Sequence, residues 1–105
     1  MPTKISFLYD NPTDSDAFEA GFPAQLELAK KLPGLIRYDS SKVWEKEDGT
    51  ETPLYRILNL YFEDYASASA AVATSQAAEV FPAVFDLATG GVRIAFADME
   101  VEETL

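Results

Sequence analysis

The sequence predicts an α+β fold in which strands and helices follow one another in the order βαββαβ. Two patterns indicate it: short runs of β-branched and aromatic residues bounded by turn residues, and intervening segments whose apolar residues recur at helical spacing. A length of 105 residues predicts a single domain, residues 1–105. Because 48% of the residues are hydrophobic, more than so small a core requires, we expect a partner to cover part of the apolar surface.

The first strand is expected over residues 4–9, and the first helix from residue 14 or 15 to the Pro33-Gly34 pair. One face of this helix is apolar at helical spacing, through Phe18, Phe22, Leu26 and Ala29. Pro23 has no amide hydrogen and its ring clashes with the carbonyl group four residues earlier. A kink or restart of the helix is therefore predicted near residues 21–23.

Two further strands are expected to form a hairpin, over residues 35–44 and 55–62. Their connection is charged and contains Asp48-Gly49, a pair typical of hairpin turns. The second of these strands is apolar on both faces, which is typical of a strand in the middle of a sheet.

The second helical region is expected to begin after an N-cap at Asp64 and to consist of two pieces. The first piece, residues 65–75, is rich in alanine, and the second, residues 77–88, contains Pro82. Gly90 and Gly91 then turn the chain into a last strand over residues 92–99. Because they lead into a strand and not a helix, these glycines do not indicate a phosphate-binding loop.

This order predicts a ferredoxin-like antiparallel sheet with both helical regions on one face, because crossover connections are right-handed. Along residues 55–62 one face holds Tyr55, Ile57, Asn59 and Tyr61, and the other holds Arg56, Leu58, Leu60 and Phe62. Neither face is polar enough to lie in water. We therefore expect the uncovered face to pack on a second copy, which gives a homodimeric α+β barrel with two-fold symmetry.

The composition excludes several classes of function. The chain has no cysteine and no histidine, so thiolate chemistry, the usual general base and the commonest metal ligand are all missing. We expect no cofactor. A net charge of -10 would repel nucleic acids and anionic membranes, and no apolar run approaches the roughly 18 residues of a membrane span. A cytoplasmic protein is the expectation, since the first residues lack the apolar stretch of a signal peptide.

Five short segments of the chain share their order and spacing with a known protein family. They are Phe7-Leu8-Tyr9, Asp16-Ala17-Phe18, Ala29-Lys30-Lys31-Leu32-Pro33-Gly34-Leu35, Leu60-Tyr61-Phe62 and Ala88-Thr89-Gly90-Gly91-Val92. Together they resemble the EthD family of dimeric α+β barrel proteins, named for an accessory protein of ethyl tert-butyl ether degradation. Relatives by fold include cofactor-independent monooxygenases, muconolactone isomerases, polyketide cyclases or decarboxylases, and haem enzymes. The resemblance therefore implies a small homodimer and selects no reaction.

One position departs from the family pattern. Members usually carry a histidine on the first helix, shortly before the Pro-Gly pair, and Gln25 stands near that place here. A glutamine forms hydrogen bonds, but it neither exchanges protons near neutral pH nor ligates haem iron. A haem or metal enzyme would thus lack its usual ligands in this chain.

Proteins of this fold commonly bind small molecules between the first helix and the sheet, so side chains expected to point there are the candidate pocket residues. They are Tyr9, Phe18, Phe22, Gln25, Tyr55, Asn59 and Tyr61. Asn59 needs a hydrogen-bond partner in an apolar strand, either a ligand or, as we favour, an ordinary structural partner. The three tyrosines offer donors to a carbonyl or phenol of an aromatic ligand, although as core or interface residues they need no ligand. The two phenylalanines are core residues first and cavity walls second.

Three further residues allow alternative interpretations. The guanidinium of Arg56 can orient a carboxylate ligand, but in so acidic a chain we favour an ion pair with an Asp or Glu, and the same holds for Arg93. Trp44, near the tip of the hairpin, is a candidate dimer contact.

Two functions remain open. The first is a cofactor-independent enzyme or accessory factor in catabolism or polyketide-type metabolism, which binds a hydrophobic or aromatic small molecule in a closed apolar cavity. The second is a non-catalytic binding or structural dimer, which the missing histidine favours. The sequence assigns no catalytic residue and no metal site.

Overall fold

The computed structural model describes residues 1–105, with four strands and three helices. Their bounds are β1 Thr3–Tyr9, α1 Ser15–Ala29, β2 Leu35–Lys42, β3 Arg56–Phe62, α2 Tyr65–Ala71, α3 Ala77–Leu87 and β4 Val92–Asp98. The predicted order of elements is confirmed, with the second helical region divided into α2 and α3. The hairpin strands are shorter than predicted, so Trp44 and Tyr55 lie on the β2–β3 loop, outside the regular strands.

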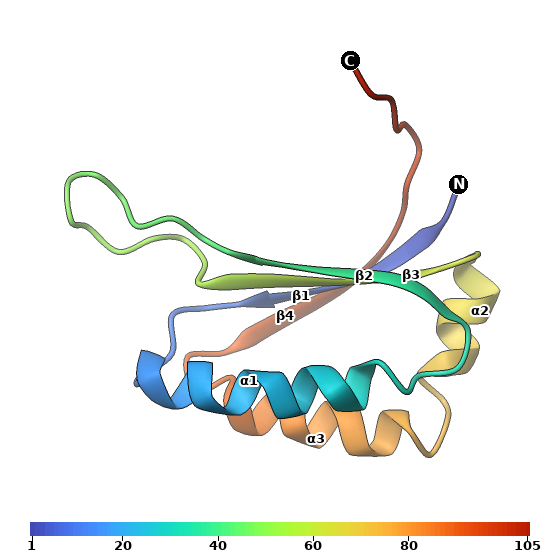
Figure 1. Cartoon of the computed structure of the whole chain (residues 1–105), viewed down its shortest axis with the longest axis horizontal. Coiled ribbons are helices and arrows are strands. Elements are labelled where there is room, and N and C mark those ends of the chain that lie inside the picture. The colour runs from blue at the N-terminus through green and yellow to red at the C-terminus, as the bar shows by residue number, and fades with distance from the viewer.

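The strands form one antiparallel sheet in the order β2-β3-β1-β4, which places β1 and β3 in the centre. All three helices lie on one side of this sheet, and the C-terminal residues extend away from them (Figure 1). The ferredoxin-like α+β fold is therefore confirmed. We call the side without helices the open face.

Helix α1 begins at Ser15 because the carboxylate of Asp14 accepts hydrogen bonds from the backbone amides two and three residues further on. The helix continues through Pro23 as one element, so the predicted restart is wrong. Gly21 is explained by packing instead, since a Cβ atom there would lie 2.8 Å from Cδ1 of Leu87 in α3. The missing side chain lets α1 and α3 approach closely, and the buried face of α1 keeps the helix on the sheet across the proline.

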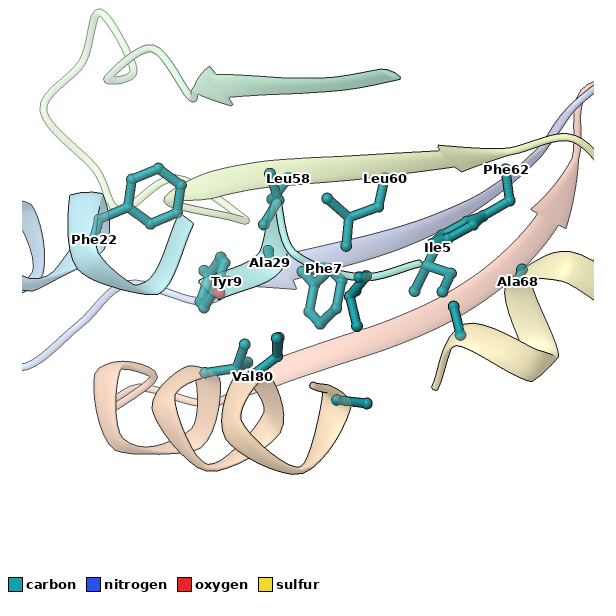
Figure 2. Close-up of a cluster of buried hydrophobic side chains, with 14 of the residues drawn as sticks. Ile5, Phe7, Tyr9, Phe22, Ala29, Leu58, Leu60, Phe62, Ala68 and Val80 are labelled. Carbon is teal, nitrogen blue, oxygen red and sulfur yellow. The ribbon is translucent and has the colours of Figure 1, made fainter. Parts of the chain in front are cut away.

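The hydrophobic core lies between the sheet and the helices (Figure 2). The central strands contribute most of its large, fully buried side chains, among them Ile5, Phe7, Leu58, Leu60 and Phe62. Helix α2 contributes Ala68 at one end of this core and α3 contributes Val80, so short side chains bring both helices close to the sheet (Figure 2).

Two glycines join the start of β4 to the end of β1. Gly91 has a φ of 106°, in the left-handed region that favours glycine, and its carbonyl oxygen accepts a hydrogen bond of 3.0 Å from the amide of Asp10. A Cβ atom on Gly90 would lie 1.9 Å from the backbone oxygen of Asn11. The two backbones are therefore in direct contact where β1 leads into α1, and this contact helps to position Tyr9.

We predict that Gly90→Ala lowers the free energy of unfolding by roughly 3 kcal/mol, because a methyl group must enter packed backbone. Urea unfolding measures this loss. The control is Gly49→Ala in the β2–β3 loop, where φ is 77° but nothing lies within 4 Å of the added carbon. Its backbone strain alone should cost about 1 kcal/mol. An equal, small loss in both variants would contradict a tight contact at Gly90.

Candidate functional site

A group of polar side chains lies between α1 and the ends of the two central strands, buried except for the exposed Glu19 and the partly buried Arg56. We call it the α1 polar cluster. Its members are Tyr9, Glu19, Gln25, Tyr55 and Arg56. Tyr9 ends β1 and faces Arg56, which begins β3, while Glu19 and Gln25 lie on α1. Figure 2 shows Tyr9 and Phe22 together at this end of the core, beside α1.

The hydroxyl of Tyr9 donates a hydrogen bond of 2.7 Å to Oε1 of Gln25, and both side chains are buried. Aromatic rings surround this bond. The ring of Phe18 lies edge-on to Tyr9 at 5.1 Å between centroids and is stacked on Phe22 at 5.7 Å. The structure thus places four of the predicted pocket residues in contact with one another, namely Tyr9, Phe18, Phe22 and Gln25.

Arg56 is the cation of the cluster. Its Nη2 atom lies 3.1 Å from Oε1 of Glu19, and its Nη1 donates to the hydroxyl of Ser40 at 2.9 Å. The guanidinium also covers the ring of Phe22, with Cζ 4.4 Å from the ring centroid. The expected ion pair with an acidic residue is therefore confirmed for Arg56. Arg93 likewise pairs with Asp10.

Three buried side-chain atoms in the structure have no hydrogen-bond partner, and all three belong to the α1 polar cluster. They are Nε2 of Gln25, Nε of Arg56 and the hydroxyl oxygen of Tyr55. Gln25 is only 2% exposed and Tyr55 9%. An unpaired buried polar group costs about 1–3 kcal/mol of stability, and native proteins contain few of them. Their concentration in one place makes the α1 polar cluster the candidate functional site.

The cluster also disfavours ionised phenols. Burial raises the pKa of Tyr9 above the ordinary tyrosine value, an effect that the positive charge of Arg56 opposes in part. Burial raises the pKa of Tyr55 as well, and the nearby carboxylate of Glu19 adds to this effect. Both phenols are neutral hydrogen-bonding groups at physiological pH.

An open cleft of about 250 Å³ lies beside the cluster, between the start of α1 and the β2–β3 loop. Tyr55 lines this cleft, and on its other side its ring meets Phe18 edge-on at 5.0 Å. The closed apolar cavity expected between α1 and the sheet is absent, because the rings of Phe18 and Phe22 occupy that space. Tyr55 therefore separates the cleft from the buried part of the cluster.

The structure places Asn59 and Tyr61 on the open face, away from the other five predicted pocket residues. Tyr55 was expected on the same face as these two, but it contacts Phe18 on the helix side. The reason is that strand geometry begins only at Arg56, so the alternation of side chains does not extend back to position 55.

On the open face a hydrogen-bonded network crosses three strands. Ser6 donates to Oδ1 of Asn59 at 2.6 Å, and Nδ2 of Asn59 donates to Asp39 at 2.9 Å. The hydroxyl of Tyr61 donates to the other oxygen of Asp39 at 2.8 Å, beneath the guanidinium of Arg37 at 3.8 Å from the ring centroid. Both ends of the Asn59 amide are paired within the chain, which agrees with the structural interpretation of this residue.

Two further features limit the chemistry of the chain. No group of three or more acidic, histidine or cysteine side chains is arranged to hold a metal ion. None of the three helices combines the length and the apolar character that crossing a membrane requires.

No family model matches the chain. A protein from Rhodococcus erythropolis, described as an uncharacterised 11.0 kDa protein in the thcB-thcC intergenic region, is 29% identical over 98 residues. The match covers 92% of this chain and 94% of that protein. The two proteins are thus similar over nearly their whole lengths.

The crystal structure of an ethyl tert-butyl ether D (EthD) family protein from Bacillus halodurans matches this structure with a TM-score of 0.87. The match covers 95% of this chain and 100% of the other, at 23% sequence identity. The chain has the fold of an EthD family protein. The predicted resemblance to the EthD family is confirmed at the level of the fold.

The EthD-like fold is shared with proteins of different descriptions. A dimeric ferredoxin-like protein of unknown function from Jannaschia sp. matches with a TM-score of 0.67 and 13% identity, over 94% of this chain and 100% of the other. SnoaB, a cofactor-independent oxygenase from Streptomyces nogalater, matches with a TM-score of 0.63 and 13% identity. The match covers 99% of this chain and 95% of SnoaB. At these identities the likeness concerns the fold alone.

The raised pKa of Tyr9 predicts a loss of stability in alkaline solution. The fold favours the neutral phenol, so the contribution of Tyr9 is complete below the ordinary tyrosine pKa of 10.0 and is lost as the pH rises above it. We expect the free energy of unfolding to fall above pH 10 less steeply in Tyr9→Phe than in the wild type. Urea unfolding at a series of pH values measures this slope. The same substitution at Tyr65, 59% exposed, is the control, and a Tyr9→Phe slope equal to that of the wild type would contradict the assignment.

Proposed function

We propose that this protein is an EthD-like homodimer that binds a hydrophobic or aromatic small molecule at the α1 polar cluster. The observation that carries the proposal is the group of three unpaired buried polar atoms, set among aromatic rings and next to an open cleft. Binding sites for small molecules combine apolar walls with a few placed polar groups in this way.

The proposed route of entry is the cleft between the start of α1 and the β2–β3 loop. Tyr55 forms part of its wall and is the side chain between the cleft and Phe18. Its hydroxyl makes no close hydrogen bond and lies near the carboxylate of Glu19, so moving this ring breaks packing contacts and this one polar contact. A ligand that displaces Tyr55 and then Phe18 would reach Arg56 and Gln25.

The open face is the proposed dimer interface. It carries no helix, and Leu8, Ile57 and the small residues Ala95 and Ala97 lie on it beside the Asn59 network. Because that network is paired within one chain, a second copy can cover it without leaving polar groups unsatisfied. The description of the Jannaschia protein as dimeric supports this arrangement for the fold.

The charges on the open face favour self-association as well. Lys4, Arg37 and Arg93 lie on this face, and two acidic residues accompany them, Asp39 beside Arg37 and Asp10 beside Arg93. In a chain with a net charge of -10, an interface with a local excess of cations reduces the repulsion between two copies.

As an enzyme or accessory factor in catabolism or polyketide-type metabolism, the protein would work without a metal or prosthetic group. SnoaB, described as a cofactor-independent oxygenase, shows that the fold accommodates such chemistry. In the cluster the proton acceptor would be the carboxylate of Glu19, since the chain has no histidine, while Gln25 and Arg56 would polarise a carbonyl group.

A non-catalytic binding or structural dimer is the second candidate. The filled space between α1 and the sheet favours it, and so does the complete pairing of Asn59 and of the Tyr9 and Tyr61 hydroxyls. The two candidates differ in whether the cluster takes up a ligand.

Native mass spectrometry with a panel of small aromatic compounds tests both parts of the proposal at once. We expect the wild type to appear as a dimer that retains up to one aromatic molecule per chain. Ile57→Glu places a charge in the middle of the open face, so it should give a monomer, since a buried unpaired charge is strongly unfavourable.

The matched control is Ala20→Glu, the same charge on the exposed surface of α1, which should remain dimeric. A dimer that retains none of the compounds would favour the structural alternative. A wild type that is monomeric at micromolar concentration would overturn the homodimer.

A further inference from the structure

The unpaired atoms of the α1 polar cluster are all hydrogen-bond donors. Gln25 has its acceptor, Oε1, occupied by Tyr9, and it leaves the NH₂ group free. Arg56 uses both terminal nitrogens on Ser40 and Glu19 and leaves the N–H of Nε free. The Tyr55 hydroxyl can donate or accept, and the carboxylate of Glu19 lies near it, so the fully free donors are those of Gln25 and Arg56. No buried carbonyl or carboxylate oxygen of a side chain is left without a partner.

The orientation of the Gln25 amide follows from its neighbour. A phenol hydroxyl donates to a carbonyl oxygen, so the Tyr9 bond holds Oε1 on the side of β1 and leaves Nε2 as the free group. Turned over, the amide would donate from Nε2 to the phenol oxygen and would leave both Oε1 and the Tyr9 proton without partners, whereas the observed orientation leaves only Nε2 unpaired. The free donor is therefore a stable property of the cluster.

We infer that the ligand of the proposed site carries an oxygen acceptor, a carbonyl or a single phenolate or enolate oxygen, on an aromatic body. This inference rests on the proposed function. The aromatic part matches the rings of Phe18 and Phe22, and the oxygen supplies the acceptor that the free donors of Gln25 and Arg56 lack.

The charges near the cluster exclude a highly charged ligand. The positive charge of Arg56 is already balanced by Glu19. The nearest additional cation is Lys42, whose Nζ lies 5.5 Å from the centre of the Tyr55 ring. Such surroundings can hold a neutral carbonyl or one delocalised negative charge. The negative charge of the chain, -10 in total, would repel a phosphate ester.

The test compares two probes of nearly the same shape, 1-acetylnaphthalene and 1-ethylnaphthalene, by NMR titration of the wild-type protein. Only the first offers a carbonyl oxygen. We expect it to bind at least about tenfold more tightly, which corresponds to one good hydrogen bond. As a third probe, 1-naphtholate distinguishes an anionic oxygen from a neutral carbonyl, and binding tighter than that of the ketone would assign the site to oxyanions.

The contribution of Gln25 is tested in the Tyr9→Phe background, so that no hydroxyl is left unpaired by the change. Tyr9→Phe alone keeps the NH₂ group but removes the bond that orients it, so it should keep a reduced preference for the ketone. Adding Gln25→Met removes that group at similar volume and should reduce the preference about fivefold, with binding of the ethyl compound unchanged. Circular dichroism confirms that each variant is folded, and the wild-type comparison does not depend on the variants.

Equal affinity of the wild type for the two matched probes would overturn this inference and leave the proposed function standing. Binding of neither probe would overturn the proposed function and the inference with it.

Discussion

Burial of the Gln25 amide beneath α1 is the constraint on which the site depends. An amide in this position needs partners, and Tyr9 at the end of β1 supplies one for the oxygen only. The two residues therefore fix how α1 lies on the sheet at this end, with Phe18 and Phe22 packed around their bond. An apolar pair would hold the helix equally well without leaving an unpaired donor. The polar pair therefore supports the proposed role of the cluster in recognition.

The two faces of the sheet differ in how completely their polar side chains are hydrogen-bonded. On the helix side the polar groups are gathered at one end and are incompletely paired, while the rest of the core is apolar. On the open face Ser6, Asn59, Asp39 and Tyr61 satisfy one another within the chain. A fully paired network suits a surface that a second copy covers, and unpaired donors suit a place that a ligand enters. This contrast assigns the two faces to different roles in the proposed function.

Much of the fold could be predicted from the sequence because its helices and strands have strong patterns, such as the apolar face of α1 and the Gly90-Gly91 turn. Pro23 misled the prediction, since the close packing that Gly21 allows between α1 and α3 has no signal in the sequence. Tyr55 was assigned to the wrong face because alternation cannot reveal where a strand begins. The partners of the polar residues were not predicted either. Asp39 contacts Asn59 because the register of β2 and β3 places the two residues opposite each other. Glu19 contacts Arg56 because α1 packs over the start of β3. Such partners follow from tertiary structure and have no local pattern.

A double-mutant cycle on Tyr9 and Gln25 tests the central claim most directly. Each single substitution, Tyr9→Phe or Gln25→Met, leaves one buried polar group without its partner and should lower the free energy of unfolding by about 1–3 kcal/mol. The double variant replaces the pair with apolar groups of similar shape and removes the unpaired donor as well. We predict that it is at least as stable as the wild type in urea unfolding. A double variant destabilised by the sum of the two single losses would contradict the account, because additive losses would mean that Tyr9 and Gln25 are not energetically coupled as a hydrogen-bonded pair.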